Sequence, residues 1–118
     1  MYSLAEYPID AHGVRISVKN NEGVDCGHVF LYILKNDLHT QPFGFAEDLF
    51  VEENVRAQGL GKMLMRRLIE VAKEKECYKL IGTSRHTRTE VHAWYERLGF
   101  TSHGIEFRMD LMDTHTTI

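Results

Sequence analysis

The sequence has few cysteines, few prolines and no long apolar run. Only two cysteines stand among its 118 residues, and Cys26 and Cys77 are too far apart to form a Cys-x-x-Cys metal or redox motif. Isolated cysteines in a core-forming domain are typical of reduced thiols, which predicts a cytoplasmic protein. No stretch approaches the 20 or so apolar residues that span a bilayer, and the first residues lack a basic-then-apolar leader. We therefore expect no membrane association.

The charged residues form no pattern that identifies a partner. The formal net charge is −3, with acidic and basic residues mixed along the chain and no basic arm, so we do not expect nucleic acid as a partner. The seven histidines form no His-x-x-x-His pair. Because metal sites need ligands at such spacings, scattered core or surface histidines are the better interpretation, and no metal is expected.

A chain of this length predicts one domain over residues 1–118, with an irregular segment at 1–13 and a polar tail at 112–118. Alternating apolar residues predict strands at 14–19 and 105–111, and denser apolar runs predict strands at 27–34, 43–51 and 78–84. Residues 20–23 are predicted to form a hairpin turn. An amphipathic helix is expected at 59–76, and a second helix from a capping box at Thr87 and Glu90 to Gly99. The predicted order is β-β-β-α-β-α-β, an α/β domain with a mixed sheet.

The segment between the third strand and the first helix contains two closely spaced glycines, Gly59 and Gly61, flanked by Arg56 and Lys62. A strand that ends in such a turn and leads into a helix leaves backbone N–H groups unpaired at the positive end of the helix dipole, which favours an anion. A P-loop would need Ser or Thr after the lysine, where Met63 stands, and a dinucleotide fingerprint lacks its third glycine. The pattern that remains is Arg-x-x-Gly-x-Gly.

With its flanking residues, this pattern resembles the coenzyme A diphosphate loop of the GNAT superfamily of N-acetyltransferases. The strand end at 47–51 is similar to the family's acidic-acidic-apolar-apolar-valine sequence, and 93–100 is similar to its second conserved motif. The resemblance covers about residues 27–111, in family order. It implies a GNAT-like mixed sheet, shortened here because the segment before the first hairpin is too short for the usual N-terminal helices. That loss leads us to expect a second copy, as a homodimer, at the acceptor pocket.

The resemblance also implies roles for individual residues. The backbone at the end of the third strand would hold the pantetheine arm of acetyl-CoA, and the glycine turn would hold its diphosphate; the residues are Leu49, Phe50, Val51, Arg56, Ala57, Gln58, Gly59, Leu60, Gly61 and Lys62. Ala57 stands where the family often has glycine, which is costly only if its φ is positive.

Two side chains are the candidates for proton transfer. Glu47 is favoured as the general base, with Asp48 or a chain of water molecules as alternatives. Strand alternation places the two carboxylates on opposite faces unless the strand bulges, and the resemblance implies a bulge here, so alternation does not decide between them. Tyr95 matches the tyrosine that protonates the leaving sulfur, although an aromatic residue at helical spacing is more often packing. Neither cysteine has a base nearby in sequence, so direct transfer is favoured over a covalent enzyme intermediate.

The leading hypothesis is an acetyl-CoA-dependent N-acetyltransferase that acts on a primary amine of a small molecule or a protein. The alternatives are a non-catalytic module that binds or senses acyl-CoA, and a domain whose sheet edge serves assembly. Binding of acetyl-CoA without thiol release would favour the first alternative, and failure to bind coenzyme A would favour the second.

Overall fold

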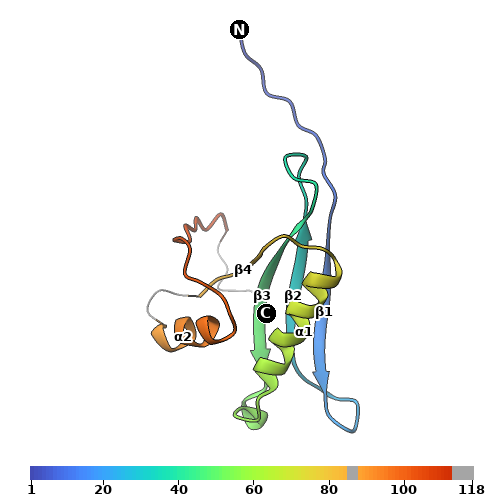
Figure 1. Cartoon of the computed structure of the whole chain (residues 1–118), viewed down its shortest axis with the longest axis vertical. Coiled ribbons are helices and arrows are strands. Elements are labelled where there is room, and N and C mark those ends of the chain that lie inside the picture. Colours follow the sequence, from blue (N-terminus) through green and yellow to red (C-terminus); the bar gives the residue numbers. More distant parts are fainter. Residues whose placement is uncertain (85–87, 113–118) are drawn as a thin grey trace. The chain divides into compact units, whose positions relative to one another are not determined.

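The computed structural model describes residues 1–84 and 88–112, so Thr87 of the predicted capping box and most of the predicted polar tail lie outside the described residues. The chain divides into two compact units, residues 1–83 and the residues from 84 onward, and each is described here by itself. Their elements are labelled in Figure 1. The first unit contains β1 (Ala11–Lys19), β2 (Asp25–Leu34), β3 (Phe43–Val51), the 3-10 turn η1 (Glu53–Val55), α1 (Leu60–Glu74) and β4 (Leu80–Gly82), and the second contains α2 (Thr89–Arg97).

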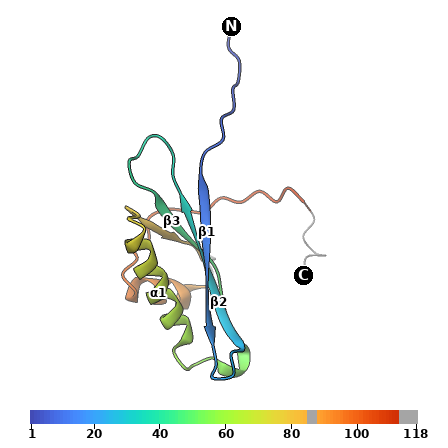
Figure 2. The ribbon, with the colours of Figure 1, turned by 90° about the vertical axis from the view of Figure 1, so that its right-hand side faces the viewer.

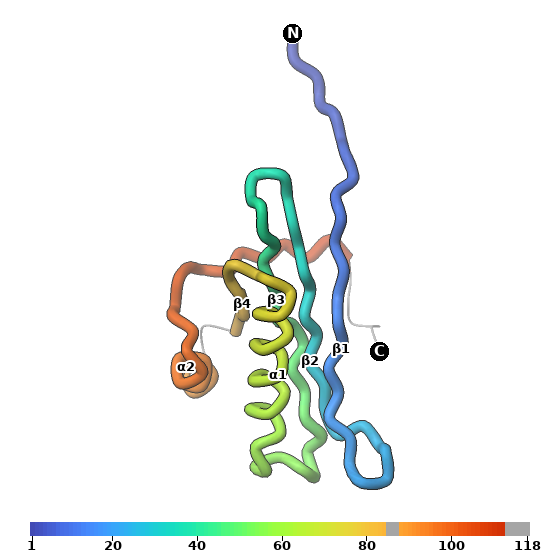
Figure 3. Tube along the Cα trace, turned by 45° about the vertical axis from the view of Figure 1, so that its right-hand side comes forward, coloured from blue at the N-terminus to red at the C-terminus, as the bar shows by residue number. Residues whose placement is uncertain are grey.

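The strands form one sheet in the order β1-β2-β3-β4. The first three pair antiparallel, and β3 pairs in parallel with β4. Figure 3 shows α1 as the connection between these two parallel strands. The mixed α/β sheet predicted from sequence is confirmed, although β4 has three residues rather than the seven expected at 78–84.

The turn between β1 and β2 is built as the sequence predicts. The Asn20 side-chain oxygen Oδ1 accepts hydrogen bonds from the backbone N–H groups of Glu22, at 2.8 Å, and Val24, at 3.0 Å. An asparagine that bonds its own following backbone in this way stabilises a tight turn. The hairpin fixes the β1–β2 register, in which Arg15 lies opposite Phe30.

One face of the sheet packs against α1, and Figure 2 shows the helix lying along that face. The alternate residues Val29, Leu31 and Ile33 of β2 are buried there together with Ala46 of β3. The helix supplies the other half of this core at a helical spacing, with Leu64, Met65, Leu68, Val71 and Ala72. Burial of this apolar surface is the main force that holds the first unit together.

We call the opposite side of the sheet the open face, because α1, the only α-helix among residues 1–83, lies on the other side. It carries the other set of alternating residues from β2, among them His28, Phe30 and Tyr32. Phe50 and Tyr32 keep 41% and 42% of their residue surface exposed. Large aromatic side chains that stay exposed on a sheet commonly mark a binding surface.

The end of α1 is a closed turn in which a glutamate occupies a glycine position. The Cys77 N–H donates to the Ala72 carbonyl at 3.0 Å, and the Glu76 N–H donates to the Lys73 carbonyl at 3.0 Å. This is the Schellman arrangement, which places Glu76 in the left-handed region, at a φ of 62°. A residue with a side chain is strained there, whereas glycine is not.

We therefore expect Glu76→Gly to raise the free energy of unfolding by about 1 kcal/mol, measured by urea denaturation. The control is Arg66→Gly, at an exposed position in the middle of the same helix, which should lower it by about 1 kcal/mol. If Glu76→Gly lost stability as the control does, the left-handed backbone at position 76 would not be strained.

The second unit departs from the sequence prediction in one element. Helix α2 ends as predicted at Gly99, which has a φ of 105°. The strand expected at 105–111, however, does not form: residues 101–112 contain no strand, and Ile105, Phe107, Met109 and Leu111 are between 73% and 91% exposed. Alternation specifies which side chains share a face, but a strand also needs a hydrogen-bonded neighbour, and this segment has none within the described chain.

Among the described residues, no helix is long and apolar enough to cross a lipid bilayer.

Candidate functional site

The turn between β3 and α1 leaves a set of backbone donors available. Gly59 caps the helix in the left-handed conformation, with a φ of 77° and a ψ of 14°. The first helical hydrogen bond runs from the Met63 N–H to the Gly59 carbonyl at 3.0 Å. The N–H groups of Leu60, Gly61 and Lys62 precede this bond, so the helix itself does not use them. These donors and the positive end of the helix dipole are the features that an anion site needs, and the anion site itself stays a prediction.

Arg56 connects this turn to the end of β3. Its Nε atom donates to the Val51 carbonyl at 2.9 Å, and its guanidinium carbon lies 5.9 Å from the centroid of the Phe50 ring. The contacts bring a positive charge to the place where the strand meets the turn. Lys62, exposed on the first turn of α1, adds a second one.

Ala57 has a positive φ, which is the costly conformation for an alanine at this position. Its φ is 69°, in the left-handed region that glycine adopts without strain. The turn therefore keeps the backbone shape that a glycine would favour, at a local cost in energy.

We expect Ala57→Gly to stabilise the protein by about 0.5–1 kcal/mol without changing the rest of the turn. Thermal unfolding measures the change. Ala93→Gly is a suitable control, because this exposed residue lies inside helix α2 and should lose stability instead. A loss of similar size at position 57 would argue against the left-handed turn.

A bulge in β3 decides which carboxylate faces which side. Glu47 lies opposite Phe30, but Phe50 rather than Leu49 lies opposite His28, so the register shifts between them. Asp48 takes the extra position, with a φ of 53°. Because of the bulge, Glu47 and Phe50 share the open face. Glu47 is half-buried, whereas Asp48 is exposed.

The register reveals a set of open-face residues that sequence reasoning did not connect. Arg15 of β1, Phe30 of β2 and Glu47 of β3 lie opposite one another in a single row across three strands. The next row contains Ser17, His28 and Phe50. Alternation in the two predicted hairpin strands places Arg15 on one face, but only the pairing register shows that it shares a row with Glu47.

Tyr95 lies on α2 in the second unit, and the structure defines its surroundings within that unit. Its ring makes edge contacts with Trp94, at 5.7 Å between centroids, and with Phe100, at 5.2 Å. The side chain is half-buried. These contacts show that Tyr95 contributes to packing; a catalytic role for its hydroxyl remains a prediction.

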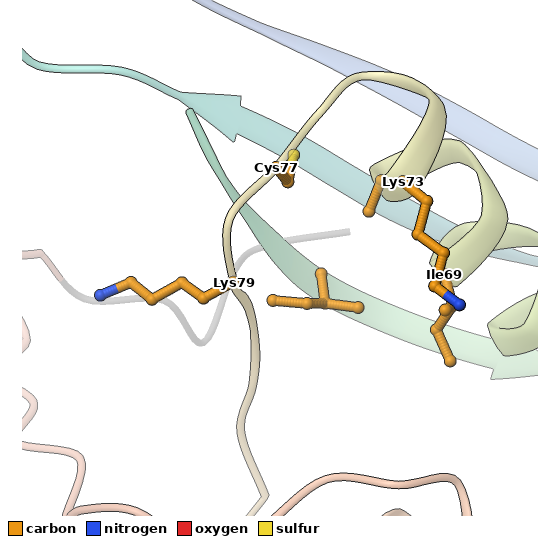
Figure 4. A pocket seen from close by; sticks show the side chains of 6 residues that line it. Ile69, Lys73, Cys77 and Lys79 are labelled. Atoms are coloured by element: carbon orange, nitrogen blue, oxygen red, sulfur yellow. The ribbon is translucent and has the colours of Figure 1, made fainter. Parts of the chain in front are cut away.

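A small pocket of about 170 Å³ lies at the other end of α1, and Figure 4 shows its lining. It is formed by Ile69, Ala72, Lys73, Cys77, Lys79 and Leu80. Burial raises the pKa of the Cys77 thiol, which lowers its tendency to form the reactive thiolate. Among residues 1–84 and 88–112, no three His, Cys, Asp or Glu side chains gather as a metal site would require.

Comparison with known proteins identifies the family. The profile of the Acetyltransferase (GNAT) family matches residues 2–100. A glucosamine 6-phosphate N-acetyltransferase from Trypanosoma brucei brucei is 40% identical over 68 residues, which are 58% of this chain and 44% of that protein. A probable glucosamine 6-phosphate N-acetyltransferase from Oryza sativa subsp. japonica is 40% identical over 63 residues, or 53% of this chain and 36% of that protein.

A crystal structure of an acetyltransferase from Trypanosoma brucei has the same fold, with a TM-score of 0.77 and 32% sequence identity over 84% of this chain and 69% of that one. The matches to the two curated relatives span less than half of the length of either protein. Because the family profile covers most of the sequence and includes both β3 and the glycine turn, this chain belongs to the GNAT family of acetyltransferases.

Proposed function

We propose that this protein is an acetyl-CoA-dependent N-acetyltransferase that transfers the acetyl group directly to a primary amine of a small molecule or a protein. One observation carries the proposal. In the glycine turn that follows β3, the N–H groups of Leu60, Gly61 and Lys62 precede the first hydrogen bond of α1. A diphosphate fits such a donor set, because its oxygens accept several hydrogen bonds and its charge is attracted by the helix dipole.

The remaining cofactor contacts follow from this placement. The backbone of Leu49, Phe50 and Val51 would hold the pantetheine amides in the manner of an added strand, and the seven residues of the turn, from Arg56 to Lys62, would hold the diphosphate. Acetyl-CoA would supply the acetyl thioester. The chain's own groups would orient that thioester along β3 and bring the acceptor amine to it.

Proton transfers complete the reaction. An alkylammonium has no lone pair, so Glu47, directly or through water, accepts a proton from the acceptor before nitrogen attacks the acetyl carbon. As the new carbon–nitrogen bond forms, the carbon–sulfur bond would break, and the Tyr95 hydroxyl would donate a proton to the departing sulfur. The nitrogen then carries one proton too many, and this proton would return the tyrosinate to its neutral form, directly or through water. The half-buried position of Glu47 on the open face supports it over the exposed Asp48.

The acceptor is sought with a thiol-release assay over primary amines, amino sugars and peptides. Glucosamine 6-phosphate belongs in this panel, because the two curated relatives are named for its acetylation. Thiol release that depends on an amine supports the transferase. Binding of acetyl-CoA without release across the whole panel would instead favour a non-catalytic acyl-CoA-binding module.

We expect Tyr95→Phe to slow thiol release about 100-fold while leaving the affinity for coenzyme A unchanged. Phenylalanine keeps the ring that contacts Trp94 and Phe100 and removes only the hydroxyl. The matched control is Tyr78→Phe, which removes the hydroxyl of an exposed tyrosine in the other unit and should have no effect. Equal rates for both variants would assign Tyr95 to packing alone.

A further inference from the structure

The open face holds opposite charges at the two ends of one row. Arg15, Phe30 and Glu47 lie side by side on β1, β2 and β3, with the aromatic ring between the cation and the carboxylate. Neighbouring strands are about 4.8 Å apart, so the backbones of the two charged residues are separated by roughly 10 Å. Two charges of opposite sign at this spacing are complementary to a small molecule that carries an amine at one end and an anion at the other.

Arg15 is positioned to receive the anion. Its guanidinium carbon lies 5.7 Å from the centroid of the Phe30 ring, so the side chain lies over the face, and 51% of its surface is exposed. It also approaches Asp25 at 3.6 Å. Lys19 is closer to the same carboxylate, at 2.8 Å, and its hydrogen bond is the main cause of the lowered pKa of Asp25. Asp25 is therefore paired mainly with Lys19, and the guanidinium group of Arg15 keeps N–H donors that can bind a ligand.

The side chains around the row form an aromatic floor. The Tyr32 ring is stacked with Phe30 at 6.5 Å between centroids and 11° between planes. On the other side, the His28 ring lies 5.4 Å from Phe30 in an edge arrangement and 5.6 Å from Phe50. Such rings limit the access of water to one side of the charged groups, and a hydrogen bond from a guanidinium to an anion is stronger than one between neutral groups.

We propose that the row of Arg15, Phe30 and Glu47 binds the acceptor, and that it selects primary amines that carry a phosphate or carboxylate. The inference rests on the proposed function, because it takes the carboxylate that accepts the proton, Glu47, as one end of the row. Arg15 is then a residue that determines specificity: it binds the anionic end of the acceptor and takes no part in the proton transfer. Phe30 supports the apolar part between the two charged ends.

Three probes with the same linker test the selection: 4-aminobutyl phosphate, 4-aminobutyrate and butylamine. Each is titrated by NMR into the full chain saturated with coenzyme A, where no turnover occurs, and each is then used as an acceptor in the thiol-release assay. We expect one or both anionic amines to bind about 10- to 100-fold more tightly than butylamine, which is the range for a charged hydrogen bond. The stronger of the two identifies the anion as phosphate or carboxylate.

Arg15→Gln should remove this preference through KM and leave kcat and the binding of butylamine unchanged. Lys75→Gln is the control, because it removes an exposed cation at the end of α1, away from the row and from Asp25, and it should keep the preference. Equal binding of all three probes, binding of none of them, or an unchanged preference in Arg15→Gln would overturn the inference. Since binding is read without turnover, selective binding in the absence of thiol release would support the row as a binding site and count against the transferase alone.

Discussion

Glu47→Gln is expected to slow thiol release by about 100- to 10,000-fold, the range for the loss of a general base. The substitution keeps the size of the side chain and removes its ability to accept a proton. Because Glu47 is half-buried on the open face, the amide can take its place without opening the core. The affinity for coenzyme A should stay within about twofold, since the glycine turn is separate from this side chain.

Asp48→Asn provides the matched control for this prediction. Asp48 is the neighbouring carboxylate, but it occupies the bulge and is exposed, so its substitution should leave the rate nearly unchanged. A large loss in Asp48→Asn with none in Glu47→Gln would exchange their roles. Full rates in both variants would indicate that a chain of water molecules, and neither carboxylate, removes the proton.

Leu68→Ala is expected to lower the free energy of unfolding by about 2–5 kcal/mol, measured by urea denaturation. Leu68 is completely buried, at 0% exposure, between α1 and the sheet. Removal of its isobutyl group leaves a cavity that the surrounding side chains, already close-packed, fill only in part. Since α1 also supports the glycine turn, partial unfolding of this variant should weaken coenzyme A binding.

The same helix offers a control of nearly equal size. Met63 lies on the outer side of α1 and is 56% exposed, so Met63→Ala should change stability by no more than about 0.5 kcal/mol. Similar losses in the two variants would show that α1 does not pack on the sheet through the face that contains Leu68.

The parts of the fold predicted correctly are those specified by local signals. Asn20 closes the first hairpin through bonds to residues two and four positions further along the chain, and Gly59 ends the turn that precedes α1. Turn geometry and helical periodicity of this kind act over a few residues, and a single sequence contains them. The glycine turn is local in the same way, because its backbone donors come from consecutive residues; the anion that they would bind stays a prediction.

The parts that were missed depend on residues far apart in the sequence. The alternating residues at 105–111 predict a strand. A strand also needs a neighbouring strand to pair with, and the alternation of residues does not show whether one is present. The row of Arg15 and Glu47 depends on the register of two strand pairs, including the bulge at Asp48. Likewise, the sequence at Ala57 does not specify its φ, because the turn around it imposes the left-handed conformation.

The most direct test of the account is an NMR titration that compares coenzyme A with pantetheine, which lacks the diphosphate. We predict that coenzyme A shifts the amide signals of Leu60, Gly61 and Lys62, and that pantetheine shifts the signals of β3 while leaving those three amides unchanged. Equal effects of the two ligands on the turn, or shifts confined to the pocket around Cys77, would contradict a diphosphate bound by the start of α1.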